Sequence, residues 1–291
     1  MAISRSPDPS SGSIQFIGTA TTLIQFGGFS VLTDPNFLHR GDTVHVGYGL
    51  HARRLTDPAV ELDQLPPVDL VLLSHLHEDH FDRVVEQRLD HDLPIVTTPD
   101  AARALRKLGF HAARDLSTWQ TWSFARAGVR LRITALPAQH TPVRMMQPLL
   151  PRVMGSLLEF TQRSDNAPLL RVYVSGDTLL HDDLREIPRR FPDIDLGLFH
   201  LGGTRIFGVM LTMDGQQGAQ AVSIISPHQA VPIHYDDYDV FKSPLADFQE
   251  AVRSAGLADR VRYLARGESL VLSRLCGSEC SARQHRHSSS A

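Results

Sequence analysis

The feature that most constrains the fold is an apolar strand pattern that runs directly into a cluster of histidines and acids. Residues 68–74, VDLVLLS, form a mainly apolar run typical of a strand that is buried on both faces of a sheet. The next six residues, HLHEDH, contain His75, His77, Asp79 and His80. Such side chains are costly to bury without partners. The segment therefore forms either a polar surface loop or a site that uses these groups.

The spacing of the cluster favours metal binding. His75 and His77 are two residues apart, so both can point the same way from an extended segment. Asp79 and His80 follow a turn and can face a second position nearby. Divalent metals bind neutral imidazole nitrogens and carboxylate oxygens. The pattern His-x-His-x-Asp-His thus offers enough ligands for two metals if other segments contribute.

Three later segments place a polar residue where an apolar strand pattern gives way to a turn. They are PAQHTP with His140, SGDT with Asp177 and VPIHYDDY with His234. Each residue alone would be an ordinary buried histidine or a turn cap. Strand ends meet at one edge of a sheet, so together they predict a common site with the first cluster.

Strand and helix patterns alternate along the chain without a repeat, which indicates one domain of mixed sheets with outer helices. We expect this domain to span residues 13–275, after a disordered lead-in at 1–12 and before a flexible tail at 276–291. The only cysteines, Cys276 and Cys280, lie in that tail and cannot cross-link a core. Residues 36–66 show little periodicity and are predicted to be a lid or a substrate-facing loop.

Composition excludes several classes of protein. The formal net charge of -3 gives no basic surface, so nucleic-acid binding is not expected. No apolar run reaches the roughly 20 residues that span a bilayer, and the start lacks a signal peptide, so a cytoplasmic location is expected. The apolar segment after His140, with Met145 and Met146, could contact a lipid-like substrate, the core or a second copy in a homo-oligomer.

Taken together, these motifs resemble those of the metallo-β-lactamase superfamily. SHLHEDH resembles its signature, and FIGTATTLIQFGGFSVLTDPNF resembles its opening strands. PAQH, SGDT and VPIHYDDY resemble its later ligand motifs, in the same order. The most similar branch contains L-ascorbate-6-phosphate lactonase and N-acyl-phosphatidylethanolamine phospholipase D. The resemblance implies an α/β fold, an αββα sandwich of two mixed β-sheets flanked by helices, with two metals at the edge of the sheets.

The resemblance also implies how the ligands are divided between two divalent ions. One ion would be held by His75, His77 and His140, the other by Asp79, His80 and His234, and Asp177 would bridge both. Zinc is favoured, with manganese or iron as alternatives. Two ions about 3.5–4 Å apart can activate a shared water to hydroxide near neutral pH. The implied reaction is hydrolysis of a phosphodiester, lactone or ester in a small-molecule or lipid-like anionic substrate.

Some positions depart from the family or carry weaker signals. Neither cysteine lies at a ligand motif, so β-lactam hydrolysis is not expected. Thr19 in GTAT replaces a histidine that is frequent in the branch. Asp34 in LTDP is either a carboxylate that orients a ligand histidine or a turn residue before proline.

Catalytic roles are predicted for Asp79 and for His200, which could protonate the leaving group, with Tyr235 and Asp236 as alternatives. Arg144 and Arg205 could meet an anionic substrate, although ordinary surface arginines are the simpler interpretation. Asp214 is predicted to cap a helix. Two other functions stay open, namely a non-catalytic metal-binding protein and a redox or thioester enzyme on the same fold.

Overall fold

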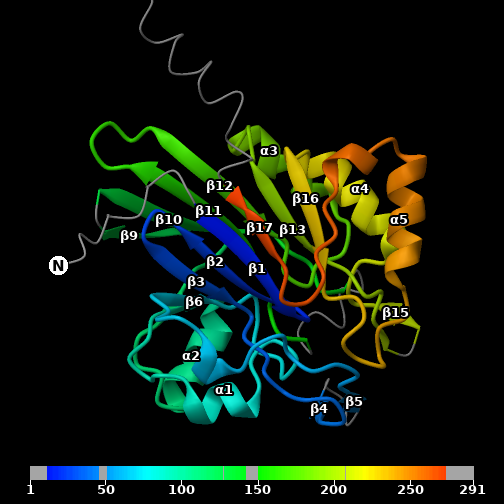
Figure 1. Ribbon diagram of the computed structural model, residues 1–291, viewed down its shortest axis with the longest axis horizontal. Coiled ribbons are helices and arrows are strands. Elements are labelled where there is room, and N and C mark those ends of the chain that lie inside the picture. Colours follow the sequence, from blue (N-terminus) through cyan, green and yellow to red (C-terminus); the bar gives the residue numbers. More distant parts are fainter. Residues whose placement is uncertain (1–11, 46–50, 127, 142–149, 207, 273–291) are drawn as a thin grey trace, which may run out of the picture.

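The strands form two large sheets that pack face to face and carry helices on their outer faces (Figure 1). The computed structural model describes residues 12–45, 51–126, 128–141, 150–206 and 208–272. Within them the layers follow the order helices, sheet, sheet, helices. The predicted αββα sandwich is therefore confirmed.

The first sheet has seven strands, which are antiparallel at one side and parallel at the other. In spatial order they are β17 (Ser269–Val271), β1 (Gly12–Gly18), β2 (Thr21–Phe26), β3 (Phe29–Thr33), β6 (Leu70–Leu72), β7 (Ile95–Thr97) and β8 (Ala113–Asp115). Gly27 and Gly28 join β2 to β3 with φ angles of 58° and 81°, which only glycine adopts freely. This is the predicted hairpin.

The second sheet has six strands, of which the first three are parallel. Their order is β16 (Gln229–Ile233), β13 (Leu196–His200), β12 (Pro168–Val174), β11 (Gly155–Gln162), β10 (Val129–Leu136) and β9 (Thr121–Arg126). Two small hairpins lie apart from both sheets. They are β4 (Thr43–His45) with β5 (His51–Arg53), and β14 (Arg205–Ile206) with β15 (Val209–Met210).

Three of the helices, α1 (Arg83–Arg88), α2 (Pro99–Lys107) and α4 (Gly215–Ile225), begin at a side-chain cap. α1 and α2 pack on the first sheet, and α3 (Glu186–Arg190), α4 and α5 (Leu245–Ser254) belong to the second. Short 3₁₀ turns are η1 (Leu62–Gln64), η3 (Asp182–Arg185) and η4 (Ala258–Arg260). Asp214 accepts the backbone N–H of Gln217, so its predicted role as a helix cap is confirmed.

The main core lies between the two sheets. Phe26 of β2 and Phe160 of β11 meet edge to face with ring centroids 5.1 Å apart. Each large apolar side chain buried in this way stabilises the fold by about 1.5–3 kcal/mol. Separate apolar clusters seal α1 and α2 against one sheet and the remaining helices against the other. Among the described residues, no helix is long and apolar enough to cross a membrane.

The topology brings many strand ends to one edge. β3 and β6 run parallel in the first sheet, and β12, β13 and β16 run parallel in the second. β10 is antiparallel to β11, which is antiparallel to β12, so β10 and β12 share a direction. The residues predicted to carry chemistry follow the carboxyl ends of these strands. Their side chains therefore meet where the two sheets end.

The segment at 36–66 is more structured than its sequence suggests. Its described residues contain the β4–β5 hairpin, η1 and a buried arginine, Arg54. The Arg54 guanidinium lies 3.5 Å from the carboxylate of Asp237 and donates a hydrogen bond to Asn36. This buried pair attaches the segment to the residues that follow β16. The predicted lead-in at 1–12 overlaps β1 at Gly12, and its residues 1–11 lie outside the described residues. The same holds for residues 46–50, Arg144, Met145, Met146 and the predicted tail at 276–291 with Cys276 and Cys280.

Replacing Arg54 with methionine should leave the Asp237 carboxylate with one buried partner fewer. We expect Arg54→Met to lower the free energy of unfolding by about 3 kcal/mol, measured by urea denaturation. The matched control is Arg53→Met, because Arg53 is the exposed neighbour on β5, and its effect should stay within about 0.5 kcal/mol. Equal effects of the two changes would contradict a structural role for the Arg54 pair.

Candidate metal centre

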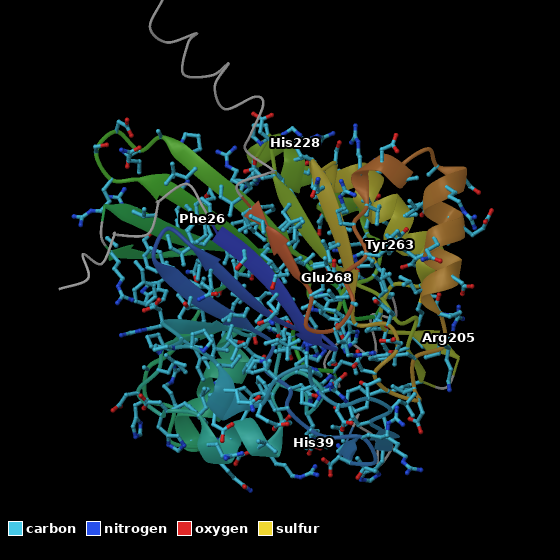
Figure 2. The ribbon with its side chains drawn as sticks, viewed as in Figure 1. Phe26, His39, Arg205, His228, Tyr263 and Glu268 are labelled. Atoms are coloured by element: carbon cyan, nitrogen blue, oxygen red, sulfur yellow. The ribbon has the colours of Figure 1, made fainter. Side chains whose placement is uncertain are left out.

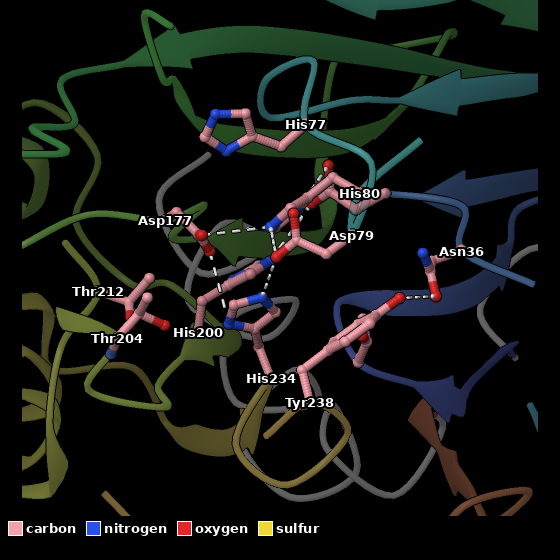
Figure 3. Close-up of polar contacts among 12 residues, drawn as sticks. Asn36, His77, Asp79, His80, Asp177, His200, Thr204, Thr212, His234 and Tyr238 are labelled. Atoms are coloured by element: carbon pink, nitrogen blue, oxygen red, sulfur yellow. Dashed lines mark hydrogen bonds and ion pairs between the residues drawn. The ribbon is translucent and has the colours of Figure 1, made fainter. Parts of the chain in front are cut away.

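The seven predicted ligands fall into two neighbouring groups at the shared edge of the sheets. One group contains His75, His77 and His140, and the other contains Asp79, His80, Asp177 and His234. Within each group the potential ligand atoms lie within 4.8 Å of one another. Figure 3 shows the second group with His77 above it. Residues from four distant segments therefore converge as the sequence predicted.

The first group consists only of histidines. The Nε2 of His75 lies 2.9 Å from the Nδ1 of His77, and the His140 ring lies 5.2 Å from that of His75. The Nδ1 of His140 donates to the carbonyl oxygen of Leu211 at 3.0 Å. That bond places the proton on Nδ1 and leaves the lone pair of Nε2 for a ligand.

The second group places two carboxylates against two imidazoles. The Nε2 of His80 lies 3.2 Å from Asp177 and 3.7 Å from Asp79. His234 lies 3.5 Å from Asp79 through Nε2 and 3.7 Å from Asp177 through Nδ1. Because each carboxylate is shared by both rings, oxygen and nitrogen atoms surround one small volume (Figure 3).

Unpartnered buried atoms test whether a metal fits here. In the described part of the chain, His140 Nε2, His234 Nε2, Asp79 Oδ1 and Asp177 Oδ1 are buried and lack a hydrogen-bond partner. Buried polar groups without a partner are rare and call for an explanation such as an ion. These four are among nine such atoms in the described residues, and they are the ones that lie together at the edge of the sheets. Their atom types suit zinc, manganese or iron. The residues present therefore fit divalent metals.

Burial and neighbouring charges set different protonation states in the two groups. Burial lowers the pKa of His75 and His140, and it lowers the pKa of His77 to about 4. These rings are thus neutral, as metal ligands must be. Burial opposes ionisation of Asp177, but His234 and His80 outweigh it and hold the pKa of the carboxyl below its usual range.

A buried carboxylate lies behind the second group. Asp34 accepts the backbone N–H of Ser74 at 2.7 Å and lies 3.6 Å from the Nδ1 of His80. Its other oxygen lies 3.3 Å from the Nε2 of His200. Asp34 therefore orients a predicted ligand from outside the site, as one of its two sequence interpretations states.

His200 is completely buried beneath this carboxylate. Its Nδ1 lies 3.1 Å from the hydroxyl of Ser175, and its ring stacks on that of His80 with centroids 6.0 Å apart. Both nitrogens are thereby occupied and no ring surface is exposed. This position suits a positioning residue better than the predicted proton donor.

Strained backbone holds several of these groups. His234, Asp34 and Thr19 have φ angles of 62°, 35° and 48°. Such values are uncommon outside glycine and concentrate at functional sites. The backbone of Thr19 holds the segment of His234, since its N–H donates to Asp237 and its carbonyl accepts the N–H of His234. The similar branch frequently has a histidine at this position, whereas Thr19 contributes through its backbone.

Gly176 lets two ligand segments approach each other. It has a φ of 61°, and a Cβ placed there would lie 2.6 Å from the carbonyl of Met154 and 3.1 Å from Ser74. Ser74 precedes the first ligand histidine, and Gly176 precedes Asp177. Only glycine therefore allows this close approach.

The remaining candidates have other partners. Tyr235 packs in the apolar cluster around α4 and α5, and burial raises its pKa to about 12. Asp236 pairs with Arg266 at 2.5 Å. Arg205 lies at the edge of the molecule, 3.9 Å from Asp214 (Figure 2). Glu78, the acidic residue of the cluster outside the predicted ligands, accepts the N–H of His45 at 2.7 Å.

Sequence reasoning missed the supports that hold the site. Asn36 donates to the carbonyl of Glu78 at 2.9 Å and accepts from Tyr238 at 3.1 Å (Figure 3). Arg54 and Asp237 continue this network. Asn36 follows the LTDP stretch and Asp237 follows His234, so proximity to a ligand motif was their available signal. Arg54 had none.

This chain is similar in sequence to known metal-dependent hydrolases. A sequence model of the family described as the beta-lactamase superfamily domain matches residues 30–235. A UPF0173 metal-dependent hydrolase from Methanosphaerula palustris is 32% identical over 202 residues, covering 69% of this chain and 84% of the relative.

Two solved structures share the fold. A possible metal-dependent hydrolase from Veillonella parvula has a TM-score of 0.74 at 21% identity, covering 89% of this chain and 99% of its own. The isothiocyanate hydrolase from Delia radicum gut bacteria has a TM-score of 0.71 at 22% identity, covering 89% and 98%. At this level of identity, the two likenesses concern the fold alone.

Substituting one predicted ligand at a time should distinguish the two groups by the amount of metal that the chain still binds. We expect His140→Ala and His234→Ala each to remove about one ion per chain, and Asp177→Ala to weaken both sites. Metal per chain, measured by plasma mass spectrometry, checks this. The control is His228→Ala, because His228 is exposed just before β16 begins, at the end of the strand opposite the site (Figure 2). Full metal content in all three ligand variants would contradict the grouping.

Asp34→Asn should weaken metal binding without removing a ligand. Asparagine tolerates the positive φ and can still accept the N–H of Ser74, but it loses the negative charge behind His80. We expect about 10–100-fold weaker affinity at one site, measured by competition with a chromophoric chelator. Asp69→Asn is the control, because Asp69 also accepts a backbone N–H but lies at the other end of β6. Equal affinities would exclude the orienting role.

Proposed function

This chain belongs to the beta-lactamase superfamily, among the UPF0173 metal-dependent hydrolases, and from that premise we propose that it hydrolyses a phosphodiester, lactone or ester bond with two divalent ions. The proposed substrate is a small anionic molecule, with a lipid-like body as one possibility. The proposed hydrolase domain spans residues 13–275. Zinc is the proposed metal, with manganese and iron as alternatives.

One observation carries the proposal. Four buried ligand atoms without partners, two on imidazoles and two on carboxylates, belong to two adjoining groups. Two ions held there would supply an activated water near neutral pH.

The side chains have distinct proposed tasks. The three histidines of the first group stay neutral because they are buried, which keeps their lone pairs available. Asp177 contributes negative charge to both groups, since its carboxylate acts on His75 and His140 as well as on His80. Asp79 is the proposed catalytic carboxylate, because its carboxylate has two oxygens, so that one can hold an ion while the other accepts a hydrogen bond from the attacking water.

The types of ligand atom also distinguish the proposed reaction from other reactions that occur on the same fold. The second group contains two carboxylates and two histidines and no cysteine. This oxygen-rich set suits hydrolysis of phosphate and acyl groups and does not favour β-lactam hydrolysis. A non-catalytic or redox protein on the same fold would bind metal as well, so turnover must decide.

The decisive experiment combines metal content with turnover. The purified chain is screened against phosphodiester, lactone and ester substrates, with and without a chelator. We expect activity that is lost with the metal and restored by adding it back. Asp177→Ala should lower activity at least roughly a thousandfold, or about 4 kcal/mol of the barrier.

The control is Asp259→Ala, which changes an exposed aspartate of η4 and should leave activity intact. Turnover that survives the chelator or Asp177→Ala would overturn the proposal. Bound metal with no turnover on any substrate would support the non-catalytic alternative, and metal-dependent oxygen consumption without hydrolysis would support the redox alternative.

A further inference from the structure

A cavity of about 880 Å³ lies beside the first ligand group. It is lined by His140 from that group and by Trp119, His181 and Arg190, with apolar wall from Leu150 and Pro151. Two acidic residues, Asp183 and Glu186, also line it, and Glu186 is neutralised by its pair with Arg189. Its volume is typical of small-molecule sites, which combine an apolar wall with a few polar groups. Because His140 reaches this wall, a molecule in the cavity would lie next to the proposed reaction centre.

Trp119 is held in the cavity wall in a strained conformation. Its φ of 72° is an outlier for a bulky aromatic residue, and its N–H donates to the carbonyl of Ala135 at 2.7 Å. Such strain persists where the surroundings enforce it, frequently at ligand sites. The indole ring also faces the guanidinium of Arg190, whose carbon lies 4.1 Å from the ring centroid.

Arg190 has no carboxylate partner within the described ranges of the chain. Its neighbour Arg189 on α3, in contrast, pairs with Glu186 at 2.6 Å. The two arginines thus differ in what they face although they are adjacent in sequence. A guanidinium fixed on an aromatic ring keeps its planar N–H edge available for an oxyanion.

His181 adds a buried polar atom to the same wall. Its side chain is 10% exposed, and its Nε2 is buried without a hydrogen-bond partner in the part of the chain that the structure describes. Its Nδ1 lies 3.9 Å from Asp183, too far for a hydrogen bond. Burial lowers the pKa of His181, so the ring is neutral, and in the tautomer that carries its proton on Nε2 it can donate to a bound oxyanion.

We propose that this cavity binds an organic anion, with its carboxylate or phosphate group held by Arg190 on Trp119 and by His181. The apolar body of the anion would contact Leu150 and Pro151. The inference rests on the proposed function, since it assigns to the hydrolase the part of the substrate that lies away from the reacting bond. It predicts binding in addition to catalysis, so the two can fail separately.

Binding can be followed through Trp119 itself. The chain has two tryptophans, so Trp122→Phe leaves Trp119 as the only indole. In the metal-loaded Trp122→Phe protein, phenyl phosphate and benzoate should quench tryptophan fluorescence, and benzyl alcohol should bind at least about tenfold more weakly. Calorimetry on the chain with both tryptophans gives the same comparison if Trp122→Phe does not fold. The ratio between phenyl phosphate and benzoate shows which anion is preferred.

Arg190→Gln should weaken binding of the better anion by about tenfold, because it removes a charged donor. Arg189→Gln is the matched control and should leave affinity unchanged. His181→Asn should also weaken binding, since asparagine cannot place an atom at Nε2. Anions that bind the metals alone would be equally tight in all variants, and that result would overturn the cavity proposal.

Kinetics with an active substrate separate the two proposals. Arg190→Gln should raise KM for an anionic substrate by about tenfold and leave kcat within about threefold, and it should spare a neutral analogue. Arg190-dependent anion binding in a protein without turnover would retain the cavity site and remove the proposed function. Turnover with equal KM in Arg190→Gln and Arg189→Gln would retain the function and remove the cavity site.

Discussion

Two buried carboxylates among five imidazoles form the interaction on which the rest of this structure depends. Asp79 and Asp177 are less than 10% exposed, and water cannot solvate their charges fully. Charges buried in this way are stable only with close compensation. The same carboxylates raise the pKa values of His80 and His234 despite burial, and a bound cation would take over this compensation once the rings release their protons to act as ligands. The atoms left without partners indicate that cations provide this compensation.

The directions of the strands bring these carboxylates and imidazoles together. Strands of both sheets end at one edge, and each delivers one short polar segment there. The geometry costs backbone strain at Asp34 and His234, which the surrounding hydrogen bonds hold in place. The Arg54–Asp237 pair then attaches the 36–66 segment over the same edge. The geometry of the candidate metal centre and the stability of the fold therefore depend on the same few contacts.

Much of the fold, and the convergence of the candidate ligands, could be predicted from the sequence. The apolar run before His75 and the glycine pair at residues 27 and 28 are local patterns with few structural solutions. The ligand motifs were recognisable because each follows a strand pattern. The supports were not, because burial of Arg54 and the stacking of Arg190 on Trp119 depend on segments far apart in the chain. Exposure cannot be deduced from residue type when packing decides it, and His200 illustrates the same limit.

The backbone of Thr19 joins the beginning of the chain to its last ligand. Its carbonyl accepts the N–H of His234, and its own N–H donates to Asp237 more than two hundred residues later. During synthesis, the histidines near residue 77 emerge long before that contact can form. Contacts of such separation close late in folding. A newly made chain would therefore bring its candidate ligands together only after residue 237 has left the ribosome.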